Sequence, residues 1–199
     1  GNPFMSDAEF DALASSYGFD AFEEGKLKKK VKHAYRMYSL QKVFDNEPSP
    51  IEGDQVASPK LDGAAISLYY GKDGVLVQAA TRGDGIEGED ITDKAYLLPN
   101  IPKQIDLQDV QVSGEIVVPK DIENARNYAS GALHLKDGGE FSQRARYMVF
   151  VAYSVTPYIQ ITYMNDLRLL INQGFLTVYD TGLDAYRQDG TVFRLNSNI

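Results

Sequence analysis

Lys60, Asp62 and Gly63 form a Lys-x-Asp-Gly motif at the head of a strongly alternating segment. A lysine amine in such a motif can act as a nucleophile, and the chemistry it suggests is attack on the α-phosphate of a nucleotide. A charged turn before a hairpin is the alternative interpretation. Average residue usage would produce this motif by chance in about 5% of chains of this length. The motif alone is therefore only suggestive.

A second group of reactive residue types lies in residues 81–90, which hold three glycines and four acids. This composition predicts neither a helix nor a persistent strand. One interpretation is a flexible acidic loop. The other is a loop that places Arg82 on a phosphate and holds Asp84 and Glu89 near a divalent ion. The second is favoured by the order of the surrounding motifs.

Glu115 lies in the middle of residues 110–118, which alternate as a half-buried strand. A carboxylate inside an apolar strand is costly unless it is hydrogen-bonded. A ribose hydroxyl or a metal ion would satisfy it.

Taken together, five segments in this order resemble the adenylation domain of NAD-dependent DNA ligases: residues 60–63, 80–90, 113–116, 125–133 and 189–194. The similarity extends from about Ser6 to the end of the chain. It implies an enzyme whose lysine takes AMP from NAD, releases nicotinamide mononucleotide and passes the AMP to nicked double-stranded DNA, with Mg²⁺ assisting.

The resemblance also implies a set of site residues. The catalytic residues would be Lys60, Asp62, Arg82, Glu115, Asp189 and Arg194. The nucleotide contacts would be Asp7, Asp11, Ser39, Leu40, Ser58, Leu61, Gly63, Arg126, Tyr153 and Val192. Metal ligands would be Asp84 and Glu89. Among these, Tyr153 would stack on adenine, while Asp7 and Asp11 would face the nicotinamide half.

The chain departs from the family pattern at several positions. Ser58 stands where the family has a glutamate that reads the adenine amino group, and His134 stands where it has an arginine. Phe10 replaces a tyrosine, and the family's preceding helix has no counterpart. An ATP- or GTP-using nucleotidyltransferase and a non-catalytic nucleotide-binding subunit therefore stay as alternatives.

The expected fold is α+β, a nucleotidyltransferase fold of antiparallel sheets flanked by helices. Residues 1–45 would form a reduced N-terminal helical region, and residues 46–199 an adenylation domain that is incomplete at its C-terminal end. Strands are expected at 64–70, 75–81, 110–118, 146–155, 175–178 and 189–195. Helices are expected at 6–17, 119–133 and 165–172, and a loop at 46–59.

Bulk composition narrows the classes of protein. The 199 residues include no cysteine, which excludes disulfides and cysteine metal sites and fits a cytoplasmic location. No apolar run is long enough to predict a membrane span. The net charge of −8 predicts weak DNA binding, although lysines cluster at 26–32. The family continues past the position of Arg194 to a further lysine motif and DNA-binding domains, whereas five residues follow Arg194 here. Either the sequence is a fragment of a longer protein, or a second polypeptide supplies these parts, and we favour the second.

Overall fold

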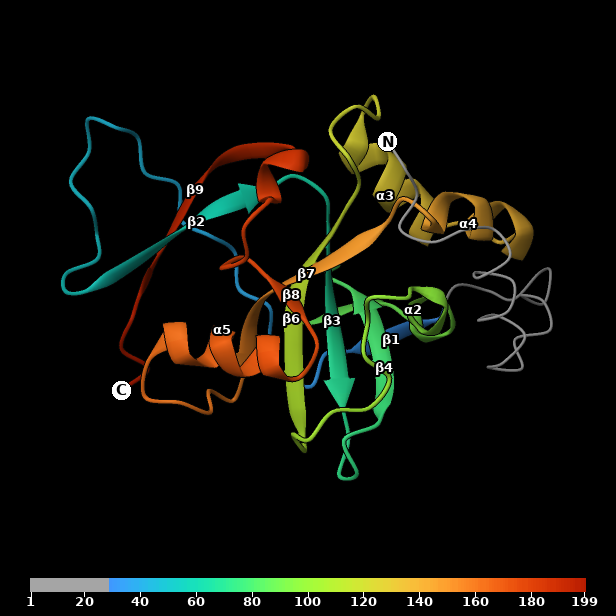
Figure 1. Ribbon diagram of the computed structural model, residues 1–199, viewed down its shortest axis with the longest axis horizontal. Coiled ribbons are helices and arrows are strands. Elements are labelled where there is room, and N and C mark those ends of the chain that lie inside the picture. Colours follow the sequence, from blue (N-terminus) through green and yellow to red (C-terminus); the bar gives the residue numbers. More distant parts are fainter. Residues whose placement is uncertain (1–28) are drawn as a thin grey trace.

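The computed structural model describes residues 29–199 and is built around a five-stranded sheet with the order β4-β3-β6-β7-β8. Its strands are β3 (Ala64–Tyr70), β4 (Leu76–Thr81), β6 (Val110–Val117), β7 (Val149–Thr156) and β8 (Leu176–Thr177). All neighbours pair antiparallel except β7 and β8. This sheet occupies the centre of Figure 1.

Two smaller sheets complete the strand framework. One pairs β2 (Gln55–Leu61) with β9 (Gln188–Leu195), and the other pairs β1 (Lys30–Lys32) with β5 (Glu87–Glu89). In Figure 1 the β2–β9 pair lies apart from the central sheet, on the side opposite α3 and α4. Each of the two small sheets thereby joins strands that are distant in sequence.

The helices cover both faces of the central sheet. They are α2 (Thr92–Leu97), α3 (Ala125–Leu133), α4 (Gly138–Ala145), α5 (Tyr163–Asn172) and the 3₁₀ turn η1 (Leu183–Ala185). Alternation along β7 separates the two cores: Phe150 and Ala152 pack with α2, α3 and α4, whereas Val149 and Val151 pack with α5 and Leu61. This two-sided burial confirms the α+β expectation.

Most expected strands are present, and the hairpin of β3 and β4 is confirmed. The expectation of a loop over residues 46–59 was wrong at its end, because β2 begins at Gln55 and carries Pro59 opposite Thr191 of β9. Proline is tolerated there because the two-stranded pair leaves an open edge. Lys60 therefore belongs to a strand rather than to a turn.

Two further expectations need correction. Residues 87–89 form β5, because Lys30–Lys32 of β1 supply a pairing partner that residue propensities do not reveal. Helix α3 starts at Ala125 instead of Pro119, since Asn124 adopts a left-handed backbone conformation with φ 53°. Helices α2 and α4 were not anticipated.

The N-terminal region is only partly described. The expected helix at 6–17, together with Asp7 and Asp11, lies outside the described residues. Residues 33–40, called the strap below, run beside the central sheet, and the Tyr35 N–H donates to Oε1 of Gln111 in β6 at 2.9 Å. The Met37 N–H donates to the carbonyl of Gly85, between β4 and β5, at 2.8 Å. The boundary at residue 45 stays a prediction. No helix in the described residues combines the length and apolar character that crossing a bilayer requires.

Candidate active site

Lys60 is positioned by the pairing of β2 with β9. The register shifts between Pro59 and Leu61, so that Lys60 stands at an irregular point of the ladder. Its Nζ lies 3.5 Å from Oδ1 of Asp189, and the two side chains are 37% and 48% exposed. Lys60 is thus accessible to a ligand and has a carboxylate beside it.

A cavity of about 310 Å³, called the nucleotide cavity below, opens beside Lys60. It gathers ten of the predicted residues: Ser39, Leu40, Ser58, Lys60, Leu61, Arg82, Glu115, Tyr153, Val192 and Arg194. Sequence reasoning missed Tyr38, Pro59, Ala65 and Val178. Their positions depend on the fold, because each is an ordinary residue type with no motif of its own.

Arg194 is held between two aromatic rings. Its guanidinium carbon lies 5.4 Å from the ring centroids of both Tyr153 and Tyr163. The Tyr163 hydroxyl donates to the Tyr153 carbonyl at 2.6 Å, which links the two tyrosines. Nε of Arg194 is buried and has no hydrogen-bond partner among the described residues. This arrangement fixes a permanent positive charge on the cavity wall.

Glu115 is the most perturbed carboxylate of the site. Burial raises its pKa to about 7, a rise opposed by the Gly63 backbone hydrogen bond and by Arg126, and increased by Asp62 and Asp189. Gly63 is required for packing within the protein, because a Cβ at this position would lie 2.0 Å from the Ile116 carbonyl oxygen. The close approach of the chain at position 63 to β6, the strand that carries Glu115, therefore requires glycine.

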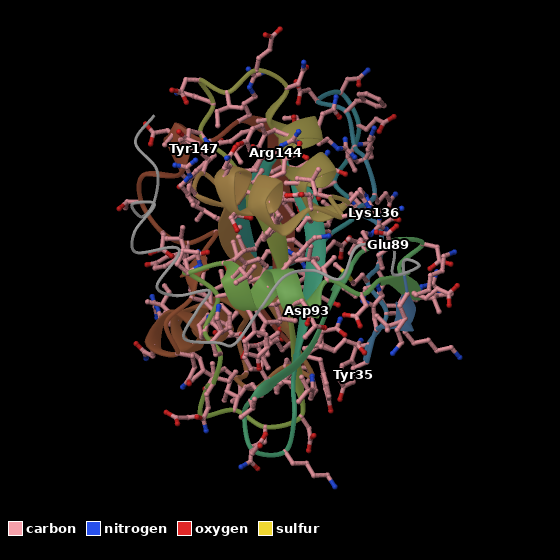
Figure 2. The ribbon with its side chains drawn as sticks, turned by 90° about the vertical axis from the view of Figure 1, so that its right-hand side faces the viewer. Tyr35, Glu89, Asp93, Lys136, Arg144 and Tyr147 are labelled. Carbon is pink, nitrogen blue, oxygen red and sulfur yellow. The ribbon has the colours of Figure 1, made fainter. Side chains whose placement is uncertain are left out.

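A second cavity of about 600 Å³ shares Ala65, Arg82 and Glu115 with the first. It brings together the other predicted residues Gly63, Asp84, Glu89 and Arg126, and adds Lys30 and His134. Figure 2 shows Glu89 on this side of the molecule, with Lys136 above it and Asp93 below. Cations and acids from distant segments are thus mixed on one surface.

Asp62 and Asp189 are not among the residues that line either cavity. The Asp62 N–H donates to the Arg187 carbonyl at 2.9 Å, which ties the end of β2 to the start of β9. Both carboxylates are close enough to Glu115 to raise its pKa. Asp62 and Asp189 therefore influence Glu115 through their charges, although neither lines a cavity.

Comparison with known proteins decides the family. The model of the NAD-dependent DNA ligase adenylation domain matches residues 26–181. This chain belongs to that family. In this adenylation domain, the eight described residues that the resemblance assigned to nucleotide contacts each line one of the two cavities, whereas Asp62 and Asp189 line neither.

Relatives of this adenylation domain are whole DNA ligases. The DNA ligase of Campylobacter fetus is 32% identical over 185 residues, covering 72% of this chain and 28% of that ligase. The DNA ligase of Chlorobium phaeobacteroides is 38% identical over 154 residues, covering 63% and 22%. The DNA ligase of a Sulfurovum species is 28% identical over 221 residues, covering 88% and 34%. The chain therefore spans about a third or less of these relatives.

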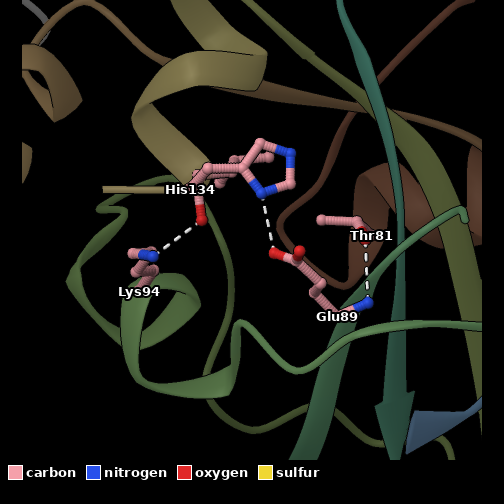
Figure 3. Close-up of polar contacts among 5 residues, drawn as sticks. Thr81, Glu89, Lys94 and His134 are labelled. Carbon is pink, nitrogen blue, oxygen red and sulfur yellow. Dashed lines mark hydrogen bonds and ion pairs between the residues drawn. The ribbon is translucent and has the colours of Figure 1, made fainter. Parts of the chain in front are cut away.

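His134 and Ser58, two of the positions that depart from the family pattern, both contact the cavities. His134 Nδ1 and Glu89 Oε2 are 2.7 Å apart, while the Glu89 N–H donates to Thr81 Oγ1 at 3.0 Å (Figure 3). Lys94 Nζ donates to the Leu133 carbonyl at 2.6 Å and fixes the end of α3. His134 is thus tied to the acidic wall of the second cavity. Ser58 is buried against the nucleotide cavity.

The acids proposed as metal ligands have partners within the protein. Oδ1 of Asp84 accepts the backbone N–H groups of Ile86 and Glu87, both at 2.9 Å, and these bonds lower the Asp84 pKa. Glu89 is bonded to His134. Residues 29–199 contain no group of three or more His, Cys, Asp or Glu side chains arranged to hold a metal ion. The described residues alone do not fit a protein-only metal site.

Proposed function

We propose that this adenylation domain transfers AMP from NAD to Lys60 and then to the 5′-phosphate at a nick in double-stranded DNA. In the first step a bond forms between Lys60 Nζ and the α-phosphorus, and the bond from that phosphorus to the nicotinamide mononucleotide phosphate breaks. In the second step the DNA phosphate oxygen displaces Lys60, which leaves AMP on the DNA.

One observation carries this proposal: Lys60 lines a cavity whose other walls supply both apolar surface and two arginines, Arg82 and Arg194. The apolar part suits a purine base, and fixed cations suit the phosphoryl oxygens that gain charge in the transition state. A lysine that lines the same cavity as both kinds of surface supports an attack by its amine on the α-phosphorus.

Lys60 must lose a proton before it can attack, because an ammonium has no lone pair. Oδ1 of Asp189 lies 3.5 Å from Lys60 Nζ and forms an ion pair with it. We assign the removal of that proton to solvent. To Asp189 we assign the orientation of the Lys60 side chain, and to Glu115 the hydrogen bonding of a ribose hydroxyl.

The remaining assignments extend the same proposal. Tyr153, Val192, Leu40 and Ser58 would contact the adenosine, while Asp7 and Asp11 would bind the nicotinamide half. Mg²⁺ commonly binds through substrate phosphates with one or two carboxylates. Asp84 and Glu89 stay predictions for that role, and we assign no reaction step to the metal.

The DNA end of the reaction is proposed from the family. The relatives are DNA ligases of which this chain covers a third or less. A second polypeptide that supplies a further lysine and DNA-binding domains remains part of the proposal. The second cavity shares residues with the nucleotide cavity and is lined both by the cations Lys30, Arg82 and Arg126 and by acids. Its cations support the proposal that a phosphate group binds on that side of Lys60.

The test is the intact mass of the chain after incubation with NAD and, separately, with ATP. We expect one AMP to be added from NAD and none from ATP. Lys60→Ala should abolish the addition, whereas Lys72→Ala, on the exposed β3–β4 turn, should retain it. Labelling only by ATP would support the ATP-dependent alternative. Binding of nucleotide without a covalent adduct would support a non-catalytic subunit.

A separate experiment addresses the nicotinamide contacts. Asp7→Ala combined with Asp11→Ala should slow the reaction with NAD. It should spare transfer from an already adenylylated Lys60 to a nick, because nicotinamide mononucleotide takes no part in that step. Equal loss in both steps would contradict the assignment.

A further inference from the structure

His33 is buried at the start of the strap and uses both ring nitrogens. It is 8% exposed. Nδ1 lies 2.6 Å from Ser67 Oγ in the central strand β3, and Nε2 lies 2.9 Å from the Arg82 carbonyl oxygen. One side chain thereby connects the strap, the central sheet and the residue that follows β4.

The partners of His33 determine where its proton lies. A carbonyl oxygen can only accept, so Nε2 carries a hydrogen and donates to Arg82. In the neutral ring, Nδ1 then accepts the hydroxyl hydrogen of Ser67. Both partners are satisfied by this tautomer, which fixes the plane of the ring.

The connection returns from Arg82 to the strap. Nη2 of Arg82 donates to Ser39 Oγ at 2.7 Å, and the Arg82 N–H donates to the Ala65 carbonyl at 2.9 Å. Arg82 and Ser39 both line the nucleotide cavity, whereas His33 lines neither cavity. His33 can therefore affect a bound nucleotide only through the residues that it holds.

Gln111 supports the strap from the neighbouring strand β6. It is 1% exposed; its Oε1 accepts the Tyr35 N–H at 2.9 Å, and its Nε2 donates to the Tyr35 carbonyl at 2.8 Å. Figure 2 shows Tyr35 at the margin of the molecule, below Glu89. The Gln111 side-chain amide thus makes the two hydrogen bonds to Tyr35 that the backbone of a neighbouring strand would otherwise make. These two bonds fix the position of the strap beside β6.

We infer that His33 is a positioning residue for nucleotide binding: it fixes the Arg82 backbone and the strap together, so that Arg82 and Ser39 meet the nucleotide in one arrangement. The inference rests on the proposed function. Without the His33 side chain, the Arg82 carbonyl and the Ser67 hydroxyl would lose buried partners. The strap would keep the bonds at Tyr35, Met37 and Ser39 and the backbone bond from the N–H of residue 33 to the Ile86 carbonyl, but it would lose its side-chain link to Arg82 and to β3.

The test compares His33→Leu and His33→Gln in steady-state adenylylation with NAD. His33→Leu should raise KM about tenfold, the equivalent of one hydrogen bond to a buried group, with a smaller change in kcat. His33→Gln retains an N–H able to reach the Arg82 carbonyl and should recover most of the lost affinity. Ser67→Ala, which leaves the bond to Arg82, should raise KM less than His33→Leu.

Tyr70→Phe is the matched control. The buried Tyr70 hydroxyl donates to the Pro102 carbonyl at 2.7 Å, away from the strap. Its loss should lower thermal stability without changing KM. An unchanged KM in His33→Leu, or an equal rise in Tyr70→Phe, would overturn the inference.

A second readout separates this inference from the proposed function. The Met37 amide, bonded to Gly85, should exchange its hydrogen faster in His33→Leu than in the wild-type chain or in Tyr70→Phe. If the wild-type chain takes up no adenylate, the proposed function fails, and exchange at Met37 still decides whether His33 holds the strap. Unchanged exchange would refute it.

Discussion

At the scale of single residues, Glu115 shows how a strand can tune a carboxyl group. Its neighbours in β6 are buried, so its charged form loses water contact, and the pKa rises to about 7. The cost of a carboxylate in an apolar strand could be predicted from the sequence. The groups that oppose this rise in pKa could not be predicted as neighbours of Glu115, because Gly63 and Arg126 come from other parts of the chain.

The raised pKa predicts the pH dependence of stability. The folded chain holds a proton on Glu115 that the unfolded chain releases near pH 4.5, so the stability due to the protonated group is lost as pH rises from 4.5 to about 7. The loss is on the order of 3 kcal/mol. Glu115→Gln should remove it, so that the variant gains stability relative to wild type at pH 8 but not at pH 4. Urea unfolding at both values measures this.

The exposed Glu123 supplies the control for that experiment. Glu123→Gln should follow the wild-type pH profile. A Glu115→Gln variant whose stability difference from wild type is the same at pH 4 and pH 8 would contradict the burial argument.

Arg194 gives a second residue-scale prediction. Arg194→Lys keeps the charge but loses a planar guanidinium that contacts both Tyr153 and Tyr163. We expect the free energy of unfolding to fall by about 1–2 kcal/mol. Arg168→Lys, which affects one contact with the exposed Tyr179, should cost less. Equal losses in thermal melts of the two variants would count against a special role for the double contact.

At the scale of elements, the prediction succeeded where hydrophobic periodicity was strong. β3, β4, β6, β9 and α5 appear close to their expected bounds. It failed where pairing across the chain decides the structure: Pro59 argued against the strand that β9 stabilises, and the glycines of residues 81–90 argued against β5. Both missed strands are short or irregular and carry site residues. Local propensity is a weak guide at such positions.

Substitution of Gly88 tests how closely β5 must approach the backbone of β4. A Cβ on Gly88 would lie 1.7 Å from the Thr81 carbonyl oxygen, which is backbone and cannot move aside easily. Gly88→Ala should therefore destabilise the chain by about 1–3 kcal/mol and slow adenylylation, because β5 forms part of the second cavity. Urea unfolding and the adenylylation rate report the two effects.

Gly131→Ala is the control for Gly88→Ala. Gly131 lies within α3, and its new Cβ would approach only the guanidinium end of the Arg144 side chain, at 3.3 Å, rather than backbone. Alanine is the better helix former, so stability should hold or rise by up to about 1 kcal/mol. A Gly88→Ala variant as stable as Gly131→Ala would show that β5 adapts freely.

At the scale of the whole molecule, the two cavities meet at Ala65, Arg82 and Glu115. The first contains Lys60 and most of the apolar lining, while the second is lined mainly by charged and small residues. A nucleotide held in the first would have its phosphates near the shared residues. By bringing β1, β4, β5 and α3 to one edge of the sheet, the fold thus places a second cavity, lined by cations and acids, next to the cavity that contains Lys60.

The net charge of −8 leads to the last prediction. DNA affinity depends largely on cations that displace counterions from phosphates, and an acidic chain offers few net cations. We expect the chain to become adenylylated by NAD yet to seal nicked duplex slowly at physiological salt, with a marked gain as salt is lowered from roughly 200 to 50 mM. A nicked duplex that already carries AMP on its 5′-phosphate bypasses the reaction with NAD and should be sealed just as slowly, since weak DNA binding limits both. Gel assays on the two substrates across the salt series measure this. Fast sealing by this chain alone, unaffected by salt, would mean that its basic residues suffice to hold DNA and that the proposed second polypeptide is not needed.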